Sequence, residues 1–179
     1  MDIRKQKTQQ AIREAFLQLR NEKNLEQISV TELAKAARIS KATFYLHYRD
    51  IYDLSEQLQQ EVIQRVITHI ESPISVLENL SYFMQQMTNA INQEEPLLTI
   101  LFSGAQMSVF PTHLEAALRE YIFTHNTELK SNEALSVRLS YHIQGGYYAD
   151  MTHVQNVGND HVLDIIADIQ KYVPSITED

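Results

Sequence analysis

Cysteine is absent from this chain of 179 residues, and proline and glycine occur only four times each. Without cysteine there is no disulfide framework, no thiolate nucleophile and no cysteine-ligated zinc finger, so the chain must fold by packing. So few prolines and glycines cannot supply the many tight turns of an all-β fold, and no strand pattern is found. Because 44% of the residues are hydrophobic, a real core can form. We therefore predict an all-α protein.

Long apolar segments are missing as well. The apolar runs are far shorter than the ~20 residues that span a bilayer. The first ten residues, MDIRKQKTQQ, carry charge where a signal peptide needs an apolar core. We predict a cytoplasmic protein without a membrane anchor, in agreement with the lack of cysteine.

Motifs of catalysis and metal binding are not found either. The sequence has no nucleophile elbow, Walker loop or dinucleotide fingerprint. Its seven histidines show no recognisable ligand spacing. Asp150 and His153 share a helix face, but the two Glu-x-x-His motifs of a helical di-metal site are missing. We expect neither a metal nor a cofactor, and an enzyme would have only generic Ser, His and Asp residues.

Charge is unevenly divided along the chain, whose net charge is −8. Residues 1–50 hold ten Lys/Arg and six Asp/Glu, a net charge of +4, and the remainder has a net charge of −12. A basic segment can bind phosphates by releasing counterions, while an acidic remainder discourages non-specific adhesion to nucleic acid. We predict two domains, residues 1–50 and residues 51–179.

The basic segment contains the pattern of a helix-turn-helix. Ser29 can cap a first helix, and Glu32 three residues later would complete a capping box. The apolar residues of that helix recur at helical spacing: Val30, Leu33, Ala34 and Ala37. After a turn at Arg38-Ile39, Ser40 can cap a second helix. Residues 5–21 show the same spacing and predict a further helix that packs over these two.

The second helix of the motif has two unlike faces. Phe44 and Tyr48 stand four residues apart and would be buried. The other side chains are rich in hydrogen-bond donors and point elsewhere: Lys41, Thr43, Tyr45, Leu46 and His47. A basic arm of Arg4, Lys5 and Lys7 precedes the first predicted helix, and it either reaches DNA or is merely solvated.

The run T-F-Y-L-H-Y-R-D at residues 43–50, followed by Tyr52, Asp53 and Leu54, resembles the recognition helix and fourth-helix start of the TetR family of transcriptional regulators. The match is dense over residues 8–54. The resemblance implies that Tyr45 and His47 hold DNA phosphates. The resemblance also implies that Lys41, Ala42, Thr43 and Leu46 face the bases. The full set of residues that we expect to contact DNA is Ser29, Thr31, Ser40, Lys41, Ala42, Thr43, Tyr45, Leu46, His47 and Arg49.

Two positions depart from the family pattern. Arg38 stands at the turn position that is usually glycine, and a positive φ there would cost roughly 1–2 kcal/mol relative to glycine. Ile51 replaces a lysine commonly found just inside the fourth helix, which removes one phosphate contact. We expect the N–H groups of that helix, capped by Asp50, and the side chain of Arg49 to compensate in part.

Beyond residue 50 the pattern is helical throughout, giving about nine helices in the chain. A long helix over 50–71 would bear one apolar stripe and belong to both domains. Prolines and polar turns, among them Pro96, Pro111 and Ser72-Pro73, separate the later helices. These are predicted at residues 74–92, 95–107, 112–130, 133–156 and 160–173.

The C-terminal half is rich in aromatic and methionine side chains, which form either an ordinary core or the wall of a ligand pocket. The resemblance implies an effector pocket there, with these candidates: Tyr82, Phe83, Met87, Phe102, Met107, Phe110, His142 and Tyr147. Gly145 and Gly146 cost roughly 1 kcal/mol each inside a helix. Either they let two helices approach closely in a dimer, as in the family, or they mark a local break.

The resemblance, with the pattern of helices and charge, implies a homodimeric, ligand-responsive transcriptional repressor that binds a palindromic DNA operator. It would have a three-helix helix-turn-helix domain followed by a helical domain for effector binding and dimerisation. Two alternatives remain open. One is an activator or co-regulator working mainly through a protein partner, and the other is a helical enzyme with an incidental helix-turn-helix.

Overall fold

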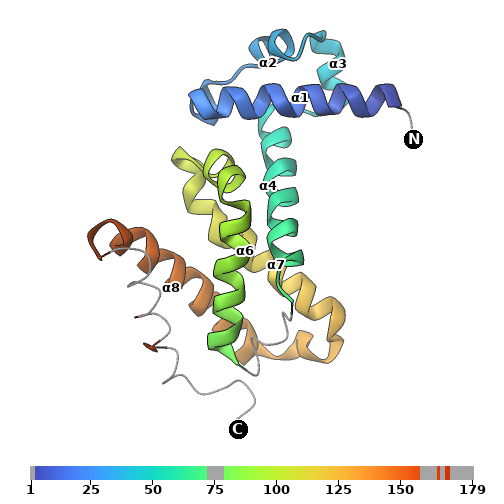
Figure 1. Cartoon of the computed structure of the whole chain (residues 1–179). Helices are drawn as coiled ribbons and strands as arrows, with labels where there is room; N and C mark the ends of the chain where they lie inside the picture. The colour runs from blue at the N-terminus through green and yellow to red at the C-terminus, as the bar shows by residue number, and fades with distance from the viewer. Residues whose placement is uncertain (1–2, 72–78, 158–164, 166–167, 170–179) are drawn as a thin grey trace. The chain divides into compact units, whose positions relative to one another are not determined.

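The computed structural model describes residues 3–71, 79–157, 165 and 168–169 (Figure 1). Within them the chain forms seven α-helices and three 3-10 helices, and no strand. The α-helices are α1 (Ile3–Glu22), α2 (Val30–Ala36), α3 (Lys41–Tyr45), α4 (Ile51–Thr68), α6 (Leu80–Leu101), α7 (Phe110–His125) and α8 (Glu133–Val157). The 3-10 helices are Leu25–Gln27, Gly104–Val109 and Thr127–Ser131. The predicted all-α class is confirmed. The predicted helix over 160–173 lies almost wholly outside the described residues, so the count of nine stays a prediction.

The chain forms two compact units. The first unit comprises residues 1–62 and 95–107, and the second comprises residues 63–94 and 108–179. Helices α4 and α6 therefore each contribute residues to both units. The functional division into residues 1–50 and 51–179 stays a proposal.

The core of the first unit follows the predicted apolar stripes. Helix α1 buries Ile12, Ala15, Phe16 and Leu19, as its spacing predicts. Helix α2 packs on α1, and α3 packs on α2 (Figure 1). Phe44 of α3 is fully buried, with 0% of its surface exposed. Small side chains allow close helix packing, and Ala34 is buried on α2. This packing turns the opposite side of α3 towards solvent.

A buried arginine joins α1 to the end of α6 within the first unit. Arg20 is only 3% exposed. Its Nη1 donates to the carbonyl of Lys23 at 2.9 Å, and its Nη2 donates to the carbonyl of Ile100 at 3.0 Å and to Ser103 Oγ at 2.6 Å. Burial lowers the pKa of the Arg20 guanidinium from its usual value. The guanidinium thus satisfies carbonyls that the last turn of α6 leaves without helical partners.

Helix α6 corrects one prediction. A break was predicted at Pro96, but Pro96 lies inside α6, which continues to Leu101. Proline there removes one backbone hydrogen bond and strains the preceding turn. The buried residues Ala90, Leu98 and Leu101 continue the apolar stripe on both sides of it, and their burial outweighs that cost. The separate helix predicted over 95–107 is therefore wrong.

The later helices agree with prediction in part. Helix α7 begins with Phe110-Pro111 and ends at His125, followed by the 3-10 turn Thr127–Ser131, so the single helix predicted over 112–130 is divided. Proline fits the first turn of α7 because its missing N–H has no helical partner there. Helix α8, Glu133–Val157, matches the prediction of 133–156.

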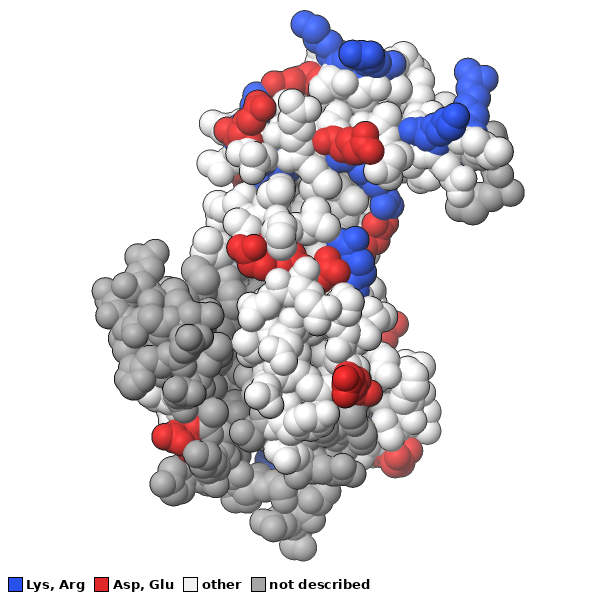
Figure 2. All heavy atoms as spheres, viewed as in Figure 1, with Lys and Arg blue, Asp and Glu red and all other residues white. Residues whose placement is uncertain are grey.

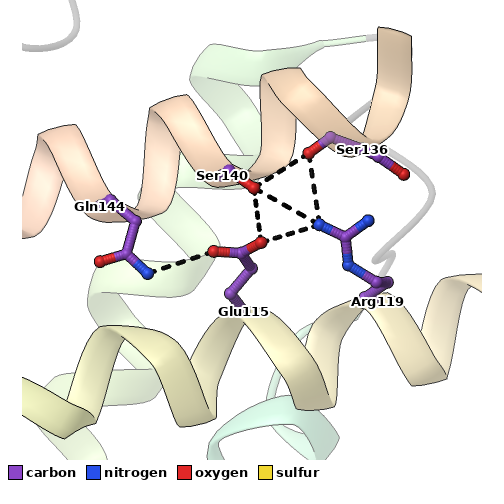
Figure 3. Close-up of polar contacts among 5 residues, drawn as sticks. All are labelled: Glu115, Arg119, Ser136, Ser140 and Gln144. Carbon is purple, nitrogen blue, oxygen red and sulfur yellow. Dashed lines mark hydrogen bonds and ion pairs between the residues drawn. The ribbon is translucent and has the colours of Figure 1, made fainter. Parts of the chain in front are cut away.

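A polar cluster connects α7 to α8 (Figure 3). The carboxylate of Glu115 accepts hydrogen bonds from Ser140 Oγ at 2.6 Å, Arg119 Nη2 at 2.7 Å and Gln144 Nε2 at 3.1 Å. Burial by itself would raise the pKa of Glu115, but these three donors outweigh it and hold the pKa below the usual 4.5. The cluster sets the register of α8 on α7 and so decides which face of α8 is exposed.

Candidate nucleic-acid interface

The ends of the three helices around the turn are capped as predicted. Ser29 Oγ accepts from the backbone N–H of Glu32 at 3.2 Å, and Ser40 Oγ accepts from that of Thr43 at 3.0 Å. Asp50 Oδ1 accepts from the N–H of Asp53 at 2.8 Å. The predicted capping box is only half formed. The carboxylate of Glu32 binds Lys23 Nζ at 2.6 Å instead of returning to the N–H of Ser29, because an ion pair is a stronger interaction for a carboxylate.

Helix α3, which ends at Tyr45, and the turn after it present the two faces that the spacing predicts. Phe44 and Tyr48 are buried, whereas 57% of Tyr45 and 81% of Leu46 are exposed. Lys41 and Ala42 are exposed, and Thr43 and His47 are half-buried. Thr43 Oγ1 lies 2.8 Å from Ser40 Oγ, so this hydroxyl is already engaged locally. The Tyr45 ring packs edge-on against Phe44, with 5.5 Å between ring centroids.

The other residues predicted to contact DNA lie at helix ends. Ser29 and Thr31 are exposed at the start of α2, and Ser40 is exposed at the start of α3. Arg49 is exposed, but its Nη2 binds Asp53 Oδ1 at 3.0 Å and its backbone N–H binds Asp53 Oδ2 at 2.8 Å. The backbone hydrogen bond is the largest cause that lowers the pKa of Asp53. Arg49 is therefore partly neutralised.

The first turn of α4 is less suited to phosphate than its sequence suggests. Ile51 is buried, with 5% of its surface exposed, so it adds no charge. Asp50 and Asp53 place two carboxylates at this end, and Asp50 takes up one of the backbone N–H groups. Negative charge at a helix N-terminus stabilises the helix but repels a phosphate. The expected compensation for the missing lysine is weakened.

Exposed cations surround the turn between α2 and α3. Lys35, Arg38 and Lys41 are all exposed, and Figure 2 shows Lys and Arg side chains gathered over the N-terminal helices on the face in view. Arg38 has a φ of 56°, the left-handed conformation considered above for a residue in the usual place of glycine. The turn therefore combines positive charge with backbone strain.

The candidates for a ligand pocket divide between the two units. In the second unit Phe83, Met87, Phe110 and His142 are buried, and half-buried Tyr147 lies 5.5 Å from Phe110 between ring centroids. Tyr82 of that unit is 43% exposed. Phe102 and Met107 belong to the first unit.

The sequence did not lead us to one further candidate for the ligand pocket, Gln86, which is buried on α6 one turn after Phe83. A polar residue within an apolar stripe at helical spacing was the signal that could have revealed it.

The two glycines of α8 have different surroundings. A Cβ added to Gly146 would lie 3.8 Å from Met84 Cε, whereas no described residue outside its own stretch of α8 comes within 4 Å of one added to Gly145. Gly145 shares an exposed face with three large side chains, Val137, Tyr141 and Tyr148, of which 65–72% is exposed.

Within the described part of the chain, no helix is both long enough and apolar enough to cross a membrane. The same residues contain no group of three His, Asp or Glu side chains that could hold a metal ion.

Residues 12–58 match a family model described as "Bacterial regulatory proteins, tetR family". A search of curated proteins and a search of solved structures found no match. The matched segment runs from Ile12 in α1 to Leu58 in α4 and so contains the whole helix-turn-helix. Regulators of this family act by binding DNA and not by catalysis, which sets aside the helical enzyme. The chain is thus a DNA-binding transcriptional regulator, and its residues 12–58 form the N-terminal helix-turn-helix domain of the tetR family.

Proposed function

We propose that this regulator is a homodimeric repressor that reads a palindromic operator through α3 and releases it when a small molecule binds the second unit. The observation that carries the proposal is the outward face of α3, with exposed Lys41 and Tyr45 over buried Phe44, in a domain that matches DNA-binding regulators. A buried side holds the helix in place, and the donor-rich side is free to enter the major groove.

Each residue of this interface has a proposed role. Tyr45 and His47 donate to phosphates, which positions the protein without reading sequence. Lys41 reads guanine or binds a phosphate, and Thr43 contacts a base edge through its methyl group or its hydroxyl. Ala42 and Leu46 offer apolar contact to thymine methyl groups. At the helix starts, Ser29, Thr31 and Ser40 donate to phosphates, and Arg49 contributes less because of Asp53.

The effector site is proposed among the buried side chains of α6, α7 and α8 in the second unit. Phe83, Met87 and Phe110 provide apolar surface, and Gln86 and His142 are buried polar groups among them. Small-molecule sites combine such apolar walls with a few polar groups. Burial, reinforced by Arg138, lowers the pKa of His142 from 6.5. Its imidazole is therefore neutral near pH 7 and can both donate and accept a hydrogen bond.

The dimer is proposed to form through the exposed face of α8. Tyr141 and Tyr148 are 65% and 72% exposed, and none of the described residues from elsewhere in the chain crowds Gly145 between them. Aromatic residues are enriched in interfaces, and a glycine lets a partner helix approach closely. A two-fold dimer would present two α3 helices to one DNA site.

One observation favours the alternative of a co-regulator that acts through a protein partner. Asp50 and Asp53 place two carboxylates at the start of α4, where Ile51 stands in place of the lysine that is common in the family. Weak or absent binding to DNA would support this alternative over the repressor.

Lys41→Ala and Tyr45→Phe test the proposed interface by mobility shift on the promoter of the protein's own operon. If Lys41 neutralises one phosphate, its loss lowers the salt slope by about one unit. If it reads a guanine, specificity relaxes at one position by ~1–3 kcal/mol. Tyr45→Phe removes one hydrogen bond to a charged group and should weaken binding to all sequences alike, by roughly 1.5–3 kcal/mol.

Lys130→Ala is the matched control, because Lys130 is an exposed lysine of the second unit. It removes the same charge and should leave affinity and salt slope unchanged. If Lys41→Ala behaves like Lys130→Ala in affinity, slope and sequence preference, then Lys41 is not part of the interface.

A further inference from the structure

Arg38 occupies a position in the turn whose left-handed backbone conformation favours glycine. Helix α2 closes with the N–H of Ile39 bonded to the carbonyl of Ala34 at 2.9 Å and the N–H of Arg38 bonded to that of Lys35 at 3.2 Å. This pair of hydrogen bonds is the Schellman motif, whose left-handed residue is usually glycine. Here that residue is Arg38, with a φ of 56°. An arginine therefore carries strain that glycine would relieve.

Strained residues that persist are often found at functional sites, and the arginine adds a cation. Arg38 is exposed, and no ion pair of its guanidinium is found among the described residues. Three other cations of the first unit are paired: Arg13 with Glu61, Lys23 with Glu32 and Arg49 with Asp53. Arg38 thus keeps its charge available.

The surface beside Arg38 is hollowed and positive. Its neighbour Ile39 lines an open hollow of about 620 Å³ together with five residues of α1: Ile3, Arg4, Lys7, Thr8 and Ala11. Of the described residues that line it, two are cations and none is a carboxylate. Lys7 is exposed there. We call this surface the α1 hollow, and its charge complements a phosphate backbone.

Ile39, which lines the α1 hollow, and Arg38 next to it precede α3 closely in the chain, so both can lie near the same DNA. Arg38 precedes Lys41 by three residues, which places their Cα atoms within about 11 Å of each other. Duplex DNA carries one negative charge per about 1.7 Å of its axis. Several phosphates therefore lie within that reach of the bases read by α3.

We propose that Arg38, with Lys7 in the α1 hollow, binds DNA phosphates beyond the base-reading face of α3, and that the strained turn is retained because glycine cannot supply this contact. The inference rests on the proposed DNA binding and adds a second backbone contact to it. The contact is sequence-independent, so it extends the footprint and the salt dependence without changing which bases are read.

Arg38→Gly tests the proposal because stability and DNA affinity should change in opposite directions. Relief of the strain should raise the melting temperature by about 2–4 °C. Affinity is measured by fluorescence anisotropy on a mixed-sequence duplex of about 30 base pairs, at salt concentrations from about 50 to 200 mM. The affinity of the parent at about 50 mM salt exceeds its affinity at about 200 mM salt by a certain ratio. Loss of one phosphate contact should make this ratio about 3.5 times smaller.

Three further variants separate charge from strain. Arg38→Lys keeps the charge and the strain, so its salt dependence should match that of the parent. Lys7→Gln should reduce the salt dependence by the same factor as Arg38→Gly without a gain in melting temperature. Lys130→Gln removes one exposed cation of the second unit and should leave DNA binding unchanged.

The outcomes distinguish the inference from the proposed function. If the parent binds the duplex and Arg38→Gly binds it with the same affinity and salt dependence, the inference is wrong and the proposed function stands. If Arg38→Gly loses both stability and affinity, the strain argument is overturned. If the parent does not bind the duplex at about 50 mM salt, the proposed function itself fails.

Discussion

Replacing Arg20 by methionine is expected to lower the free energy of unfolding by about 2–4 kcal/mol. The guanidinium is buried and donates to the carbonyls of Lys23 and Ile100 and to Ser103 Oγ. Methionine fills part of the volume but donates no hydrogen bond. Each acceptor that loses its partner costs about 1–3 kcal/mol, and hydrogen bonds that the acceptors keep with other donors reduce the total. Urea unfolding measures the effect. If the slope of the free energy of unfolding against urea concentration is unchanged, the folded and unfolded states have kept their compactness.

Arg65→Met is the matched control for that measurement. Arg65 Nε lies 3.2 Å from Glu94 Oε2 and its side chain is 51% exposed, so this ion pair should contribute no more than about 1 kcal/mol. Equal losses of stability in the two variants would contradict the assigned role of Arg20. Arg20→Lys should fall between the parent and Arg20→Met, because a single ammonium cannot reproduce the planar fork.

Effector binding is expected to change operator affinity by roughly 5–150-fold, the usual range for coupling of about 1–3 kcal/mol. Helix α4 contributes residues to both units. A ligand that repacks Phe83, Met87 and His142 can therefore alter how the two copies of α3 are presented. By reciprocity, operator DNA must change effector affinity by the same factor.

The coupling is measured after a thermal-shift screen has identified a ligand. The ligand is titrated by calorimetry into the protein with and without operator DNA. Different affinities in the two titrations, by the same factor that the ligand imposes on DNA binding, are the predicted result. Equal affinities at a saturable site in the second unit would show that the regulator is not gated by that ligand.

Local features of the interface could be predicted from the sequence because neighbouring residues determine them. The caps at Ser29, Ser40 and Asp50 involve partners three residues away. The buried position of Phe44 follows from helical spacing. The positive φ of Arg38 also agrees with its place at the end of a helix.

Features that depend on distant partners could not be predicted in this way. Arg20 meets the end of α6 about 80 residues later, and no local pattern distinguishes it from a solvated arginine. Helix α6 passes through Pro96 because burial of Leu98 and Leu101 outweighs a local preference. Phe83 and Phe102 were both candidates for one ligand pocket, but they belong to different units. Spacing shows which side of a helix is apolar, and not what covers it.

Selection of DNA from a random pool tests the central proposal most directly, since it assumes neither the operator nor the effector. A two-fold dimer with one recognition helix per subunit should enrich an inverted repeat, with half-site centres about 10–10.5 base pairs or a multiple apart. Sedimentation of the complex should show two protein chains per site. Enrichment of a single asymmetric half-site bound by one chain, or of no sequence at all, would contradict the account.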